Sequence, residues 1–360
     1  MLKQAAFFVV LYLFITNTYA QTRKYSNEFL NIGVSARAFG MGNSVIASCN
    51  DVSAAYWNPA GLMRAKEKFQ FSVMHSNYFS GIANYDYGGV YKRFDDQNAG
   101  GFSIIRFGID NIPNTIDLRG PSGEIDYNRI KTFSAADWAF MGTYSHMLRN
   151  GNTSIGGTAK LIHRTIGSFA NAWGFGFDFG MQHKKDDWIF AVMARDVTFT
   201  FTGWKYTFTE TEKAQLQQTG NVVPQSSLEV ATPRIIGGVS RKITLNEKIS
   251  MLPEANLQIT TDGRRNSLIS TRAGSVNPSL GVETNYADIV FLRVGIYNFQ
   301  KEKDILGKTK TTLQPTIGVG LKLNNLMVDY AFTDIGGSSA ALYSHVFSLR
   351  LGIGKVETEE

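Results

Sequence analysis

Five histidines, one cysteine and many serine and aspartate residues are the candidates for chemistry in this chain of 360 residues. None of the histidines lies at a metal-ligand spacing such as HExxH; they are His75, His146, His163, His183 and His345. The sole cysteine, Cys49, cannot form a disulfide within the chain. The glycine-rich stretch 174–180 lacks the Lys-Ser/Thr pair of a phosphate-binding loop, and no serine lies in a nucleophile elbow. We therefore expect no enzyme activity, no metal and no cofactor.

A second group of candidates consists of charged side chains that alternate with apolar ones: Arg293, Lys322, Asp329 and Arg350. Successive side chains of a strand point to opposite faces, so each charge lies on the face opposite its apolar neighbours. Two interpretations follow. The four residues form a basic patch that binds an anionic head group or carboxylate, or they form a ladder of ion pairs that stabilises the wall of the fold. We favour the ladder, because Asp329 offers the cations a partner.

The elements that would position these charges are about 14 alternating stretches between Phe69 and Ile353. Short polar turns such as 287–288 and 324–325 alternate with longer links, the largest at 108–136 and 196–233. Short turns on one rim and long loops on the other are typical of outer-membrane barrels. The sequence therefore predicts an all-β fold, a transmembrane antiparallel β-barrel of about 14 strands that spans residues 69–353. The last residues, 354–360, form a periplasmic tail.

The two faces of the wall differ in chemistry. In one stretch, Phe175, Phe177 and Phe179 share a face, while Gly176 and Asp178 share the other. We expect the aromatic face to meet lipid and the glycine face to leave room in the lumen. A Lys or Arg that faces lipid at the bilayer midplane costs roughly 2–4 kcal/mol, so we expect charges on the inward face.

Composition agrees with a membrane barrel and argues against other classes. The chain is 43% hydrophobic, yet after its first residues it has no apolar run near the roughly 20 residues of a membrane helix. The net charge of +6 is spread along the chain without a basic block, so we expect no nucleic-acid partner. The expected surroundings are outer-membrane lipid.

The N-terminus reads as an export signal followed by a compact insert. Residues 1–20 contain Lys3, an apolar run and a small-residue cleavage site after Ala20. Residues 21–68 are predicted to form a plug in the lumen, built around the stretch 33–62, which is too rich in Gly, Ala and Ser for a conventional core. An ordinary N-terminal loop is the alternative. The motif residues are Arg37, Gly40, Gly42, Asn58, Pro59 and Ala60.

The link 196–233 is a candidate partner-binding loop. Thr209 and Glu212 have the spacing of a capping box, and Gly220 suits a helix end, so a short helix is predicted there. The candidate contact residues of this loop are Trp204, Tyr206, Glu212 and Lys213. The helix either contacts a partner or shields a pore.

Residues 35–42 (SARAFGMG) and 56–62 (YWNPAGL) resemble the plug of FadL-type outer-membrane proteins. Residues 27–30 (NEFL), 108–115 (GIDNIPNT) and 328–334 (VDYAFTD) resemble the PorV/PorQ family within that superfamily. The chain departs from the pattern because it ends on a charged tail and not on a terminal aromatic residue.

The resemblance implies two functions of different classes. PorV-like proteins serve the type IX secretion system, which implies protein partners in a secretion or assembly complex. FadL-type proteins transport long-chain fatty acids or other small hydrophobic compounds, which implies a hydrophobic ligand. The long loops of this chain are polar, so the sequence favours protein interaction over transport.

Overall fold

The computed structural model describes residues 26–118, 123–303, 307–335 and 343–356. The predicted export signal, the first residues of the predicted plug and the end of the predicted tail lie outside these ranges. Within the described part of the chain, no helix is both long and apolar enough to cross a membrane.

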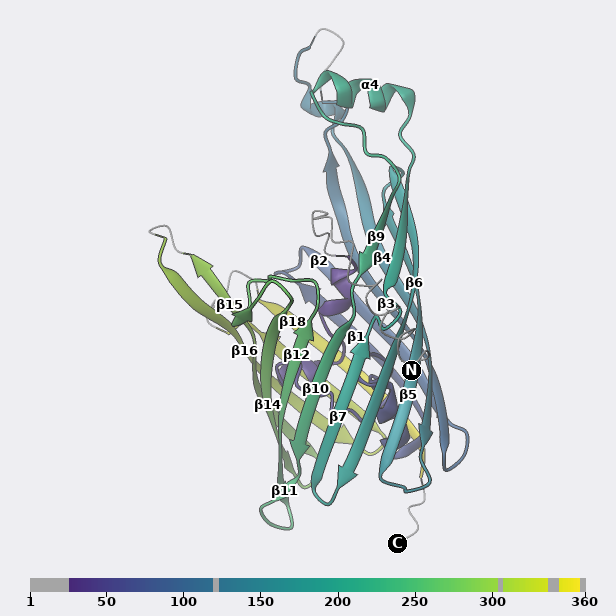
Figure 1. The fold of residues 1–360 in the computed structure, drawn as a ribbon, viewed down its shortest axis with the longest axis vertical. Helices are drawn as coiled ribbons and strands as arrows, with labels where there is room; N and C mark the ends of the chain where they lie inside the picture. Colours follow the sequence, from purple (N-terminus) through teal and green to yellow (C-terminus); the bar gives the residue numbers. More distant parts are fainter. Residues whose placement is uncertain (1–25, 119–122, 304–306, 336–342, 357–360) are drawn as a thin grey trace, which may run out of the picture.

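Among the described residues, fourteen antiparallel strands form a closed barrel, because the first strand pairs with the last (Figure 1). This confirms the predicted architecture. The strands of the wall are β1 (Glu67–Tyr78), β2 (Ala83–Arg93), β3 (Asn98–Asn114), β4 (Lys131–Met147), β5 (Thr153–Ile166), β6 (Ala170–Lys185), β7 (Trp188–Arg195), β10 (Arg234–Arg241), β12 (Ile249–Thr260), β14 (Ser275–Tyr286), β15 (Val290–Lys303), β16 (Thr309–Leu323), β17 (Leu326–Thr333) and β18 (Ser344–Lys355).

Several short elements were not predicted as strands. They are β8 (Thr200–Tyr206), β9 (Ser227–Ala231), β11 (Ile243–Thr244) and β13 (Ile269–Ser270). β8 pairs with β6 beyond the end of β7, and β9 pairs with β8. The link 196–233 is therefore an extension of the wall above the barrel and not an irregular loop. Its helix α4 (Glu210–Gln218) lies beyond the strand ends, at the top of Figure 1.

The two rims differ as the loop lengths predict. At the short-turn rim, Ala287 and Asp288 both have positive φ angles, 53° and 55°, within the tight three-residue connection 287–289 between β14 and β15. At the opposite, long-loop rim, the β15–β16 hairpin leans away from the barrel axis while the wall around β4, β6 and β9 stands tall (Figure 1). The long-loop rim is therefore asymmetric, with one low side.

The outer face of the wall is apolar, and the inner face is mixed, with charged side chains beside apolar ones such as Met74, Ile105 and Met141. In β6, Phe175, Phe177 and Phe179 are about half exposed, whereas Asp178 between them is 6% exposed. This alternation confirms the assignment of the aromatic face to the outside. The glycine face does not leave empty space, because a Cβ on Gly180 would lie 2.9 Å from Pro59 Cδ. The expectation of free room beside these glycines is wrong at this position, where the N-terminal segment packs.

The outer face carries one polar row near the long-loop rim. His75 pairs in register with Asp86, and Asp86 with Arg106. The Asp86 carboxylate lies 2.7 Å from His75 Nδ1 and forms an ion pair with Arg106 at 3.5 Å. The row continues across the next strands with Trp138 and Trp173, typical of the aromatic girdle at a membrane interface. Charges therefore do not lie on the inward face alone, because a paired charge is tolerated at the interface.

Inside the barrel lies the N-terminal segment, residues 26–66. Its elements are η1 (Glu28–Asn31), α2 (Ala36–Gly40), α3 (Ala54–Trp57) and η2 (Pro59–Arg64), drawn in purple in Figure 1. A short 3₁₀ turn, η3 (Tyr127–Arg129), lies in the β3–β4 link. α2 contacts β15 to β18, and η2 contacts β3 to β6, so the segment spans the lumen between opposite parts of the wall.

The segment has little regular structure, so its backbone groups need partners from elsewhere. Inward side chains of the wall supply them. The Glu254 carboxylate accepts from the backbone N–H groups of Ala47 and Ser48 at 2.8 and 3.0 Å, and the Gln70 side chain accepts from Val52 N–H at 2.8 Å. The Gln182 amide donates to the carbonyl oxygen of Ile46 at 3.1 Å. The inner face is thus shaped to this segment.

Candidate functional site

A chain of buried ion pairs joins the N-terminal segment to three strands. Arg37 donates to both carboxylate oxygens of Glu283, at 2.8 and 3.2 Å. Arg293 donates to Glu283 at 2.6 Å and, through Nη1, to Asp329 at 2.6 Å. The Arg293 side chain is fully buried. The structure therefore brings Arg293 and Asp329 together, and it adds Arg37 and Glu283 to them.

The other two predicted charges lie apart from this chain. Arg350 forms an ion pair with Asp51 in the N-terminal segment. Burial would raise the pKa of Asp51, but Arg350, the Ser53 hydrogen bonds and Arg37 outweigh it, so the pKa is lowered. Among the described residues, Lys322 has no ion-pair partner. The four predicted residues therefore do not form one ladder or one basic patch.

The motif residues of the segment are fixed by close packing. A Cβ on Gly40 would lie 2.9 Å from Gly318 Cα, and Gly42 has a positive φ of 59°. Asn58 is extended, with φ −159° and ψ 105°, as expected before Pro59. Its side-chain oxygen accepts from Ala60 N–H at 3.2 Å and its amide donates to the Met181 carbonyl oxygen at 3.2 Å. These residues contact the wall, which agrees with a structural role.

A second ion cluster lies on the tall side of the wall and was not predicted. Lys160 donates to Asp178 and Asp196 at 2.7 and 2.6 Å, and Arg234 donates to Asp196 at 3.1 Å. These side chains are at most 7% exposed. The cluster links side chains of β5, β6 and β10 to Asp196, the residue that directly follows β7. It therefore lies at the junction of the wall with the β8–β9 extension. Asp178 was noted only as an inward residue.

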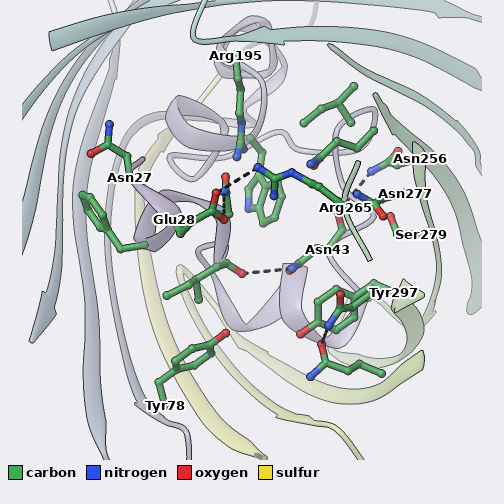
Figure 2. Close-up of a pocket in the computed structure, with 18 of the residues that line it drawn as sticks. Asn27, Glu28, Asn43, Tyr78, Arg195, Asn256, Arg265, Asn277, Ser279 and Tyr297 are labelled. Atoms are coloured by element: carbon green, nitrogen blue, oxygen red, sulfur yellow. Dashed lines mark hydrogen bonds and ion pairs between the residues drawn. The ribbon is translucent and has the colours of Figure 1, made fainter. Parts of the chain in front are cut away.

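Above the N-terminal segment, towards the long-loop rim, the barrel contains an open cavity of about 600 Å³. Figure 2 shows side chains of the segment and of several strands around this space, among them Asn27, Asn43, Tyr78, Asn277 and Tyr297. Its floor is the N-terminal segment. A cavity of this size is typical of sites for small organic molecules.

The candidate partner-binding residues have different environments. Trp204 is on β8, is 6% exposed and lies 5.0 Å from the Arg164 guanidinium, and it stacks with Tyr206. The capping box of Thr209 and Glu212 is formed as predicted. Lys213 pairs with Glu210 on the surface of α4. Trp204, predicted as a candidate contact residue of a partner-binding loop, is largely buried because β8 packs its ring against Ala170 and Ala172.

Among the described residues, no cluster of three or more His, Cys, Asp or Glu side chains could hold a metal ion. Cys49 is buried in the N-terminal segment, where burial raises the pKa of its thiol. A thiol of raised pKa is a poor nucleophile. The buried groups described above are thus suited to packing and hydrogen bonding.

Comparison with known proteins identifies the fold. The structure is similar to the toluene transporter TbuX of Ralstonia pickettii, with a TM-score of 0.54 and 12% identity over 89% of this chain and 98% of that one. It is similar to the monoaromatic hydrocarbon channel CymD, with a TM-score of 0.55 and 10% identity over 90% and 98% of the two chains. It is also similar to the toluene transporter TodX of Pseudomonas putida, with a TM-score of 0.54 and 11% identity over 88% of this chain and 96% of that one.

These similarities, all at low sequence identity, show that the chain shares the barrel fold of these proteins. No protein family model matches the chain, and no curated protein matches it. The PorV/PorQ resemblance is not confirmed.

Proposed function

We propose that this protein is an outer-membrane transporter that takes small organic molecules into the barrel from the long-loop rim. The observation that carries the proposal is the cavity of about 600 Å³ between that rim and the N-terminal segment. In this proposal the long-loop rim faces the outside of the cell, and the export signal delivers the chain to the outer membrane. The solved structures of similar fold, described as toluene transporters and a monoaromatic hydrocarbon channel, support it.

The N-terminal segment acts as a plug in this proposal. It forms the floor of the cavity and is held from two sides, by the Arg37–Glu283 pair at β14 and by the hydrogen bond from Val52 N–H to Gln70 on β1. A substrate in the cavity can therefore leave towards the short-turn rim only after the segment, or part of it, has moved. Such a movement also separates apolar side chains of the segment, among them Phe39, Met41 and Leu62, from the wall, so it requires local rearrangement of the apolar core.

The test compares a blocked cavity with a shortened loop. Ser279→Trp places a ring at the cavity wall, whereas deletion of residues 207–222 removes α4. Each variant is first checked for membrane insertion by heat-modifiability on gels. We expect uptake of a hydrophobic probe such as toluene into cells that carry the protein to fall at least tenfold with Ser279→Trp. The loop deletion should leave uptake nearly unchanged.

The second candidate function is protein interaction in a PorV-like role linked to type IX secretion or another export complex. The observation in its favour is α4, which stands beyond the strand ends and has no buried residue. In that role, the loop deletion would abolish co-purification of protein partners, while Ser279→Trp would have no effect. This result would support protein interaction and contradict transport. The sequence alone favoured interaction, whereas the cavity favours transport.

A further inference from the structure

The cavity wall has a chemistry that a site for plain hydrocarbons does not need. Uncharged hydrogen-bonding side chains gather on β12, β14, β15 and β16, and they are Gln258, Asn277, Ser279, Asn298, Gln300 and Gln314. Each amide side chain can both donate and accept hydrogen bonds. This group, here called the amide wall, lies on four successive strands of the barrel, and Figure 2 shows Asn277 and Ser279 of it side by side.

Some side chains of the amide wall form hydrogen bonds with one another, and others do not. Asn298 donates to Gln314 at 2.7 Å, and Gln300 donates to Asn298 at 2.8 Å. Gln258 and Asn277 are direct neighbours in the β12–β14 register and are partly exposed to the cavity. Within the described residues, neither of their side-chain amides has a hydrogen-bond partner. Two adjacent amides with unused donors and acceptors are suited to bind a ligand with hydroxyl groups.

Aromatic rings line other parts of the same cavity. Tyr78 lies 4.2 Å from Phe79 and 6.4 Å from Phe107, measured between ring centroids, and Trp57 and Tyr297 also face the space. Ring faces are apolar and contact the C–H groups of a flat or cyclic ligand.

The charged side chains at the cavity are already engaged. Arg265 pairs with Asp262 and Glu28, and Arg164 pairs with Asp137. Arg195 donates to the Tyr56 hydroxyl and backbone carbonyl. A charged ligand would have to compete with these contacts, so the cavity favours a neutral one.

We propose that the cavity binds neutral ring compounds that carry several hydroxyl groups, the chemical class of short saccharides and aryl glycosides. The ring stacks on the aromatic side chains while its hydroxyl groups bond with Gln258 and Asn277. A hydrocarbon in the same place would bury these amides without partners, which is unfavourable for a polar group. This inference rests on the proposed function for the role of the cavity, and it names the substrate class.

Titration calorimetry of the purified full chain in mild detergent tests the inference, with phenyl glucoside and toluene as probes. We expect phenyl glucoside to bind more tightly than toluene. The double variant Gln258→Leu, Asn277→Leu should weaken the binding of phenyl glucoside at least tenfold and strengthen that of toluene. The matched control is Gln97→Leu, an exposed glutamine at the short-turn rim that should leave both affinities unchanged.

Two outcomes would overturn the inference: tighter binding of toluene than of phenyl glucoside, or equal glucoside affinity of wild type and the double variant. If the double variant does not fold, Ser279→Trp takes its place and should abolish glucoside binding. Uptake into proteoliposomes separates this inference from the proposed function. Glucoside binding without uptake would support the proposed binding site and contradict transport. Toluene uptake without glucoside binding would support transport and contradict the proposed binding site.

Discussion

Arg37 and Glu283 form a two-point ion pair that joins positions 246 residues apart, with Nε–Oε2 at 2.8 Å and Nη2–Oε1 at 3.2 Å. Glu283 also accepts from Arg293 at 2.6 Å. One carboxylate therefore serves two buried guanidinium groups, one on the N-terminal segment and one on the wall. The attachment of the segment and the order of the inner wall depend on the same residue.

Glu283→Gln should destabilise the barrel strongly. The change leaves two buried cations without their shared anion, and breaking a buried ion pair in this way costs about 3–5 kcal/mol. Denaturant unfolding in detergent, followed by gel mobility, measures the loss. The control is Glu247→Gln in the exposed turn before β12, which should change the free energy of unfolding by less than about 0.5 kcal/mol. Equal losses for the two variants would contradict the role of Glu283.

Asp329→Ala should destabilise the barrel less than Glu283→Gln but more than Asp95→Ala. Asp329 is buried and serves Arg293, which still keeps Glu283 as a partner. Asp95 lies in an exposed turn, where hydrogen bonds from Asn98 and Gln97 lower its pKa. The three variants are ranked by their midpoint temperatures of heat-modifiability. If Asp329→Ala and Asp95→Ala unfold at the same temperature, the pairing of Asp329 does not contribute to stability.

The Asp51–Arg350 pair should make stability depend on acid pH. The folded-state pKa of Asp51 is below its ordinary value of about 3.9, because Arg350 and the Ser53 hydrogen bonds outweigh the effect of burial. A lowered pKa contributes stability that is complete above the ordinary value and is lost as pH falls through the folded value. Wild type should therefore lose stability below about pH 4.

Asp51→Asn removes the titrating group, so this variant should be less stable at neutral pH and should lose less stability on acidification. Unfolding midpoints recorded at several pH values measure both effects. Parallel pH profiles for wild type and Asp51→Asn would show that another carboxyl group is responsible.

Gly42→Ala should destabilise the attachment of the N-terminal segment. Gly42 has a φ of +59°, and a Cβ there would lie 2.7 Å from the backbone nitrogen of Ile296. The left-handed backbone costs a non-glycine residue about 1–2 kcal/mol, and overpacking adds about 1–3 kcal/mol.

Gly81→Ala is the matched control for this change. Gly81 also has a positive φ, +86°, but no atom lies within 4 Å of its Cβ position. Gly81→Ala should therefore lose only the stability that corresponds to the left-handed backbone conformation. Protease protection of the segment, together with unfolding midpoints, distinguishes the two variants. Equal effects would mean that contact with β15 does not hold Gly42.

The sequence by itself determined the fourteen strands of the barrel wall, the two rims and the outer face of the barrel, but not the short strands such as β8 and β9. These features follow from local patterns, since the alternation of Phe175, Phe177 and Phe179 with small or polar residues has the period of a strand. The capping box at Thr209 predicted α4 for the same reason, because its partners lie three residues apart.

The tertiary structure decided which inward residues meet. The sequence indicated Arg293 and Asp329, but it did not single out Glu283, and it assigned Lys322 to a group that it does not join. The amide wall was also missed, because Gln258 and Asn277 become neighbours only through the register of β12 and β14. Such contacts depend on the closure of the barrel and on the path of the N-terminal segment through it. The pattern of residues along a strand indicates on which face each side chain lies, but it does not indicate which side chain of another strand or of the N-terminal segment it contacts.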